Sequence, residues 1–143
     1  MDQGLGNNSY GKGSDTKMTI DNKDKERMLP TIIAVDFDGT LVENKYPEIG
    51  EINQTVWQAV LAAQNSGVKL ILWTSRTEEF LDDAVQFCKQ NGLIFDAIND
   101  NIDEVKALGW NARKVFATLY VDDRSAWLAE GAFEQMDKWV LFG

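Results

Sequence analysis

The 143-residue chain contains no histidine and a single cysteine, Cys88. Without histidine it cannot form Ser–His or Cys–His nucleophile pairs, use a histidine general base, or bind zinc through imidazole. One cysteine cannot form an internal disulfide, so we expect a reducing, cytoplasmic location. Catalysis would therefore depend on carboxylates, lysine, hydroxyls and hard metal ions.

Long apolar runs and clusters of basic residues are also missing. No apolar run reaches the roughly 18 residues that a membrane span needs, and the N-terminus lacks the apolar stretch of a secretory signal. Acidic residues outnumber basic ones by 23 to 14, which gives a net charge of −9. A nucleic-acid partner is disfavoured, because phosphate backbones are bound by clustered lysine and arginine.

The first thirty residues differ in composition from the remainder. Glycine, asparagine, serine and lysine dominate at first, and a charged run follows over residues 21–27. Such a segment buries too little apolar surface to offset its ordering entropy, so we predict a flexible tail over residues 1–29. Met18 could equally be the true start, with residues 1–17 a non-native addition. One folded domain is expected over residues 30–143.

From Pro30 onward, apolar patterns typical of strands and helices alternate. Strands are predicted over residues 31–36, 68–73, 94–98, 117–121 and 139–142, and helices over residues 51–66, 77–91, 101–109 and 125–135. Gly67 and Gly92 are predicted to end the first two helices. This alternation predicts an α/β fold with a mostly parallel sheet and right-handed crossovers.

The most informative segment is the run Ile32–Val35 followed by Asp-Phe-Asp-Gly-Thr-Leu. A short, β-branched apolar run is typical of a strand that is buried on both faces and ends at the ligand-binding edge of the sheet. Asp36 and Asp38 would then stand together and require a cation or a shifted pKa. The alternative is an acidic turn in which Asp38 and Gly39 only shape the backbone.

Polar side chains also follow two other predicted strands. Thr74 and Ser75 come directly after the second strand, where they could bind a ligand or cap the next helix. Arg76 could reach a substrate anion or face solvent, and we favour the solvent-facing interpretation. Asp122 and Asp123 follow the fourth strand, where the alternative to a metal site is a surface turn.

These segments, in this order, resemble the motifs of the haloacid dehalogenase (HAD) superfamily. Residues 32–41 resemble motif I of its phosphatases, residues 68–76 resemble motif II, and the Asp122–Asp123 pair resembles motif IV. Lys114 is our choice for the lysine of motif III, and Lys106 is its rival. The resemblance implies a three-layer, Rossmann-like fold with five strands in the order 3-2-1-4-5.

The resemblance also implies roles for these residues. Asp36 would be the nucleophile that forms an aspartyl-phosphate, and Asp38 the general acid and base. Mg²⁺, which prefers oxygen ligands, would be bound by Asp36, Asp38 through its backbone carbonyl, and Asp122 or Asp123, with Asp122 the first choice. The phosphoryl group would be held by the remaining set: Gly39, Thr40, Thr74, Ser75 and Lys114.

The connections between these motifs are too short for a cap domain, so the resemblance implies a capless member with an open site. A homo-oligomer could cover that site, and the flap over residues 42–49 is either a specificity element or a plain loop. The function expected is Mg²⁺-dependent hydrolysis of a small phosphomonoester such as a nucleotide or sugar phosphate. The alternatives are a phosphatase for a macromolecular phosphate and a non-catalytic, metal-binding module.

Overall fold

The computed structural model describes residues 21–124, which belong to two compact units, Met1–Pro30 and Thr31–Gly143. The described part of the first unit is the short helix α2 (Asn22–Arg27), which the sequence did not predict. The Asp21 side chain caps this helix by accepting from the Asp24 N–H at 2.8 Å, and Arg27 donates to the Asp24 carboxylate at 2.6 Å. No residue of α2 is buried. The flexible tail over residues 1–29 stays a prediction.

The second unit is built on a parallel sheet. Its strands are β1 (Ile32–Val35), β2 (Lys69–Leu72), β3 (Ala97–Ile98) and β4 (Leu119–Val121), in the order β3-β2-β1-β4. All three neighbouring pairs are parallel. The α/β class and the order of the first four strands are therefore confirmed. The fifth strand and the helix predicted over residues 125–135 lie outside the described residues.

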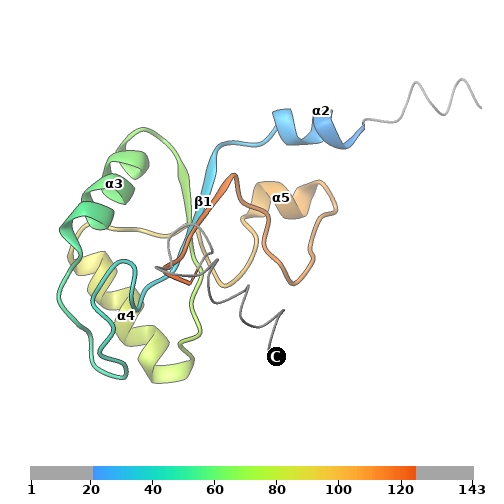
Figure 1. Ribbon diagram of the computed structural model, residues 1–143. Helices are drawn as coiled ribbons and strands as arrows, with labels where there is room; N and C mark the ends of the chain where they lie inside the picture. Colours follow the sequence, from blue (N-terminus) through green and yellow to red (C-terminus); the bar gives the residue numbers. More distant parts are fainter. Residues whose placement is uncertain (1–20, 125–143) are drawn as a thin grey trace, which may run out of the picture. The chain divides into compact units, whose positions relative to one another are not determined.

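Helices connect successive strands of this unit. They are α3 (Gln54–Asn65), α4 (Glu78–Gln90) and α5 (Asp103–Ala107), each slightly shorter than predicted. Gly67 and Gly92 follow the ends of α3 and α4, as expected. In Figure 1, α3 and α4 lie on one side of β1 and α5 lies on the other. Within residues 21–124, no helix has the length and apolar character needed to cross a membrane.

The main apolar core lies between the sheet and the first two of these helices. Phe37, Trp57 and Cys88 pack there with other buried side chains, among them Val35, Val60, Leu70, Leu72 and Ala84. Alternate strand residues point to opposite faces, so Ala34 and Ile71 face the other side, yet they are also buried. Cys88 is fully buried in this core, and burial raises the pKa of its thiol to about 12.

The direction of the chain across the sheet reverses at β1. From β1 the chain moves to β2 and then β3, after which β4 pairs with the opposite edge of β1. In open α/β sheets, such a reversal leaves a crevice at the carboxyl ends of the two strands concerned, and ligands bind there. The fold therefore places the residues that follow β1 and β4 at a ligand-binding position.

Candidate functional site

Asp36 and Asp122 directly follow the two strands at this reversal. The parallel register pairs Val35 with Val121. The Asp36 N–H donates to the Val121 carbonyl at 2.9 Å, so the pairing continues past the end of β1. Asp36 and Asp122, which the resemblance assigns to one metal site, therefore lie at the same edge of the sheet.

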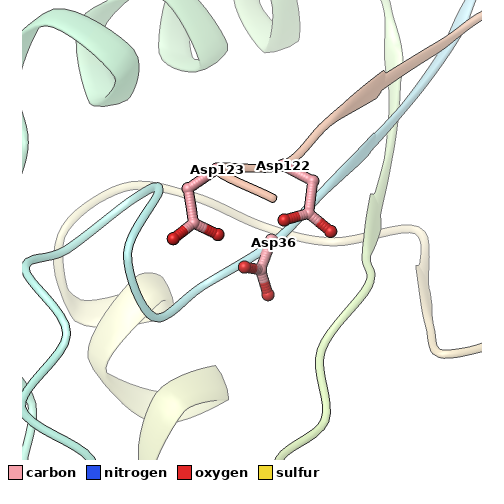
Figure 2. A group of neighbouring side chains, drawn as sticks. All are labelled: Asp36, Asp122 and Asp123. Carbon is pink, nitrogen blue, oxygen red and sulfur yellow. The ribbon is translucent and has the colours of Figure 1, made fainter. Parts of the chain in front are cut away.

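These two aspartates form a cluster with Asp123. One carboxylate oxygen from each of the three lies within 4.8 Å of the others, and all three side chains are partly buried. Figure 2 shows Asp122 and Asp123 on the segment after β4, with their carboxylates beside Asp36. Both members of the predicted acidic pair are therefore placed to share a ligand with Asp36.

The turn after β1 supports Asp123. Gly39 has φ of +85°, and a Cβ added there would lie 2.3 Å from an Asp123 carboxylate oxygen. Thr40 is 3% exposed, and its hydroxyl accepts from the Asp123 N–H at 3.0 Å. The sequence assigned Gly39 and Thr40 to phosphate binding. In the structure both lie against Asp123, and neither is among the described residues that line the cavity. Their role in phosphate binding stays a prediction.

Burial and the neighbouring carboxylates raise the pKa values of two members of the cluster, Asp36 and Asp123. Burial, followed by the charge of Asp122, raises the pKa of Asp36 from 3.8 to about 7. Burial and the hydrogen bond to Asp122 also raise the pKa of Asp123. The fold thus holds the carboxylates so close together that their negative charges would repel one another. A bound cation would relieve this cost.

The donor set fits a hard divalent cation. The Asp123 Oδ1 atom is buried and has no hydrogen-bond partner among the described residues, although buried polar atoms normally have one. The available ligands are all oxygens, the type that Mg²⁺, Ca²⁺ and Mn²⁺ prefer. Asp36, Asp122 and Asp123 are therefore suited to hold such an ion.

A cavity of about 720 Å³ opens beside the carboxylate cluster. Its volume is within the range typical of small-molecule sites. Asp36, Asp38 and Asp122 lie in its wall. Its other described lining residues come from the flap and from the carboxyl ends of β2, β3 and β4: Asn44, Tyr46, Trp73, Thr74, Ser75, Arg76, Asn99 and Arg124. Four of these lining residues were not predicted from the sequence: Asn44, Trp73, Asn99 and Arg124.

Thr74 and Ser75 both line this cavity, and their contact with a substrate stays a prediction. The Thr74 hydroxyl accepts from the Arg76 N–H at 3.1 Å, and the Thr74 N–H donates to the Asn99 side chain at 2.8 Å. Because a hydroxyl can donate while it accepts, the Thr74 O–H remains able to bind an anion. Neither residue caps α4, which begins after Thr77.

Arg76 does not face solvent, so the favoured interpretation of the sequence was wrong. Its side chain is 1% exposed and makes a two-point ion pair with Asp38, with Nε donating to Oδ2 at 2.7 Å and Nη2 donating to Oδ1 at 2.8 Å. This hydrogen bonding raises the pKa of Arg76. The acid–base candidate of the sequence analysis is thus held by a buried guanidinium, which sequence spacing gave no means to foresee.

Neither candidate for the motif III lysine is among the described lining residues. The Lys114 ammonium lies over the Tyr120 ring, 5.3 Å from its centroid, and Lys106 donates to the Asp100 carboxylate at 2.6 Å. The cationic side chains in the described wall are Arg76 and Arg124. A signal for the latter was its place two residues after Asp122, next to the predicted metal ligands.

The sequence matches no family model, and a search of curated proteins finds no significant match. A search of solved structures finds a conserved protein coded by a locus from Bacteroides thetaiotaomicron, whose description states no function. The two chains are 36% identical with a TM-score of 0.62, and the match covers 78% of this chain and 91% of that one.

Proposed function

We propose that this chain, which belongs to the same family as the conserved Bacteroides thetaiotaomicron protein, is a Mg²⁺-dependent phosphatase of the HAD superfamily. Its substrate would be a small phosphomonoester, such as a nucleotide or sugar phosphate. The proposal draws on the sequence motifs of this chain and on the geometry of its site.

The observation that carries the proposal is the position of the three carboxylates beside a cavity with a hydroxyl-bearing wall. A phosphate dianion would be repelled by Asp36, Asp122 and Asp123 unless a cation lay between them. When held by these side chains and the Asp38 main-chain carbonyl, Mg²⁺ would neutralise phosphoryl charge and favour the ionised form of Asp36.

Asp36 is the nucleophile in this proposal. One of its carboxylate oxygens forms a bond to phosphorus while the bond from phosphorus to the ester oxygen breaks, which gives an aspartyl-phosphate and an alcohol. Water then attacks the same phosphorus and releases Asp36 and inorganic phosphate. The backbone pairing of Asp36 with Val121 fixes the nucleophile on the rigid end of β1.

Asp38 handles the protons of both steps. It gives a proton to the departing alkoxide and later takes one from the attacking water. In the structure both of its oxygens accept from Arg76, so the side chain is held in one orientation as an acceptor. That arrangement suits the second step directly, whereas the first step requires Asp38 to have taken up a proton.

The substrate oxygens are bound by the wall of the cavity. Thr74 and Ser75 offer hydroxyl donors, and Arg124 offers the positive charge that the sequence analysis assigned to Lys114. The organic part of the substrate would contact Tyr46 and Trp73. A cavity of about 720 Å³ accommodates a small metabolite.

The test is a panel of phosphomonoesters, with nucleotides, sugar phosphates and p-nitrophenyl phosphate, assayed with Mg²⁺ and with a chelator. We expect turnover only with the metal, and its loss in the Asp36→Asn and Asp122→Asn variants. Asp82→Asn, on the exposed face of α4, is the matched control and should keep wild-type activity.

Two results would contradict the proposal. Turnover that survives in Asp36→Asn would remove the nucleophile assignment. A folded chain that binds Mg²⁺ and hydrolyses no member of the panel would favour a non-catalytic, metal-binding role.

A further inference from the structure

Arg76 makes more contacts than an ion pair with Asp38 requires. Its Nη1 atom donates to the carbonyls of Pro47 and Phe80 at 3.1 and 3.2 Å, and Nη2 also donates to the Glu48 carbonyl at 2.9 Å. A single guanidinium thus joins a site carboxylate, two carbonyls of the flap and the first turns of α4. A charge-assisted, two-point pair is also among the strongest polar contacts in proteins.

Aromatic rings enclose the same guanidinium. Its central carbon lies 5.0 Å from the centroid of Phe37 and 5.1 Å from that of Tyr46. Phe37 is a buried core residue, whereas Tyr46 belongs to the flap, is 52% exposed and lines the cavity. Tyr46 also packs edge-on against Phe80. The ring of Tyr46 is therefore held by contacts with Arg76 and with Phe80 of α4, and it also lines the cavity.

The flap itself is closed at its base. At the base of the flap, residues 42–49, the Glu43 N–H donates to the Glu51 carbonyl at 2.8 Å. Its first residue, Val42, forms an antiparallel bridge with Ile52. Between these ends, residues 43–48 are exposed. The contacts with Arg76 are therefore the polar link, among the described residues, between the tip of the flap and the sheet edge.

We propose that Arg76 is a positioning residue that sets the orientation of Asp38 and the position of the flap together. A lysine could supply the charge but not the planar fork that reaches Asp38, Pro47 and Glu48 at once. The capless site is in this way preformed: the acid–base group and the Tyr46 wall are held by one buried side chain. The catalytic part of this inference rests on the proposed function, and the structural part does not.

The structural part is tested by hydrogen exchange of the flap in Arg76→Lys. We expect the flap amides that donate hydrogen bonds, those of Glu43 and Tyr46, to exchange at least about tenfold faster than in wild type, the factor that corresponds to one lost charge-assisted hydrogen bond. Arg113→Lys, at an exposed position, is the control and should leave flap exchange unchanged. Equal flap exchange in the two variants would overturn the proposal.

Because Arg76 is buried, its replacement could unfold the chain, so a second variant is needed. Tyr46→Leu removes the flap ring from the guanidinium but spares the pair with Asp38. We expect it to fold and to raise flap exchange by a few-fold, the loss of one cation–π contact. Unchanged flap exchange in a folded Tyr46→Leu chain would contradict the proposed role of Arg76 in positioning the flap.

The catalytic part is tested by a double-mutant cycle with p-nitrophenyl phosphate and Mg²⁺. Arg76→Lys should lower kcat by about tenfold or more in the wild-type background, and by less than about twofold when Asp38→Asn is already present. Losses that multiply independently would show that Arg76 does not act through Asp38. If the wild-type chain has no turnover, the proposed function fails, while the flap measurement still tests whether Arg76 positions the flap.

Discussion

Asp36 links the protonation of the site to the stability of the fold. Its pKa of about 7 lies above the ordinary value because of burial and Asp122. A raised carboxyl pKa stabilises the fold fully below the unfolded value, near 3.8, and this contribution is lost as pH rises through about 7. The metal-free protein should therefore lose stability between about pH 4 and pH 8.

The variant Asp36→Asn cannot ionise and should escape this loss. In the presence of a chelator we expect its free energy of unfolding to exceed that of wild type by about 1–3 kcal/mol at pH 8. The difference should shrink toward zero at pH 4. Urea titrations at both pH values measure it, and a wild type that is the more stable of the two at pH 8 would contradict the pKa assignment.

Asp38 should reveal its two roles through the leaving group. In Asp38→Asn, p-nitrophenolate can depart without a proton, while water is no longer deprotonated. We therefore expect a burst of about one p-nitrophenolate per chain, followed by turnover slowed by about 10²–10⁴-fold. Stopped-flow absorbance shows the burst. With an alkyl phosphate, whose alcohol is not coloured and is quantified after rapid acid quench, no burst is expected, and a burst of equal size with both substrates would refute the leaving-group role.

Gly39 should matter for metal binding as well as for folding. A methyl group there would combine a strained, left-handed backbone with a contact to the Asp123 carboxylate. We expect Gly39→Ala to weaken Mg²⁺ binding by about tenfold or more, a loss of about 1.4 kcal/mol in calorimetry. Gly67→Ala is the matched control because it has a similar φ of +90° but no neighbour within 4 Å. It should lower stability and leave Mg²⁺ affinity unchanged.

At the scale of elements, the pairing of β1 with β4 holds Asp36 and Asp122 together. Next to this pairing, the Ile32 N–H donates to the Thr118 hydroxyl at 3.0 Å. Thr118→Val keeps the shape and leaves that donor, on a fully buried residue, without its partner. We expect unfolding free energy to fall by about 1–3 kcal/mol. Thr55→Val, on the exposed side of α3, should change stability little, and equal losses would contradict this account.

The sequence predicted the strands well where burial alone determines them. Ile32–Val35 and Lys69–Leu72 are nearly continuous apolar runs, which few structures other than a buried strand accommodate. The edge strand β3 is shorter than predicted. Its preceding residues include Asp96, whose side chain accepts from the Leu70 N–H at 2.8 Å. That side-chain contact replaces part of a regular ladder, which no pattern of apolar residues encodes.

Site residues could be predicted from the sequence only where they directly follow a strand. Asp36, Thr74 and Asp122 satisfy that condition, because parallel strands bring their carboxyl ends to one edge. The role of Arg76 depends on the path of a flap whose Glu48 carbonyl lies 28 residues away in sequence, so its contacts could not be read from spacing. Lys114 was chosen because its spacing is similar to that in HAD proteins, and in the structure its ammonium lies over the Tyr120 ring.

At the scale of the whole molecule, the described site needs no cap domain to be organised. The carboxylates lie at the strand reversal, and the flap forms one wall of the cavity. The buried Arg76 guanidinium donates hydrogen bonds both to Asp38 and to the flap. The acidic balance of the chain, with a net charge of −9, disfavours the approach of anionic substrates unless a cation is bound. Metal dependence should therefore be a property of substrate binding as well as of catalysis.

The central claim is that Asp36 carries the phosphoryl group during turnover. The most direct test is to quench Asp38→Asn with acid during its reaction with p-nitrophenyl phosphate and Mg²⁺, and to locate the modification by peptide mass spectrometry. We predict one phosphoryl group per chain, located on the Asp36 side chain within the peptide that contains it. No phosphoryl group is expected when Mg²⁺ is chelated. A phosphoryl group on another residue, or Mg²⁺-dependent turnover with no trapped intermediate, would contradict the account.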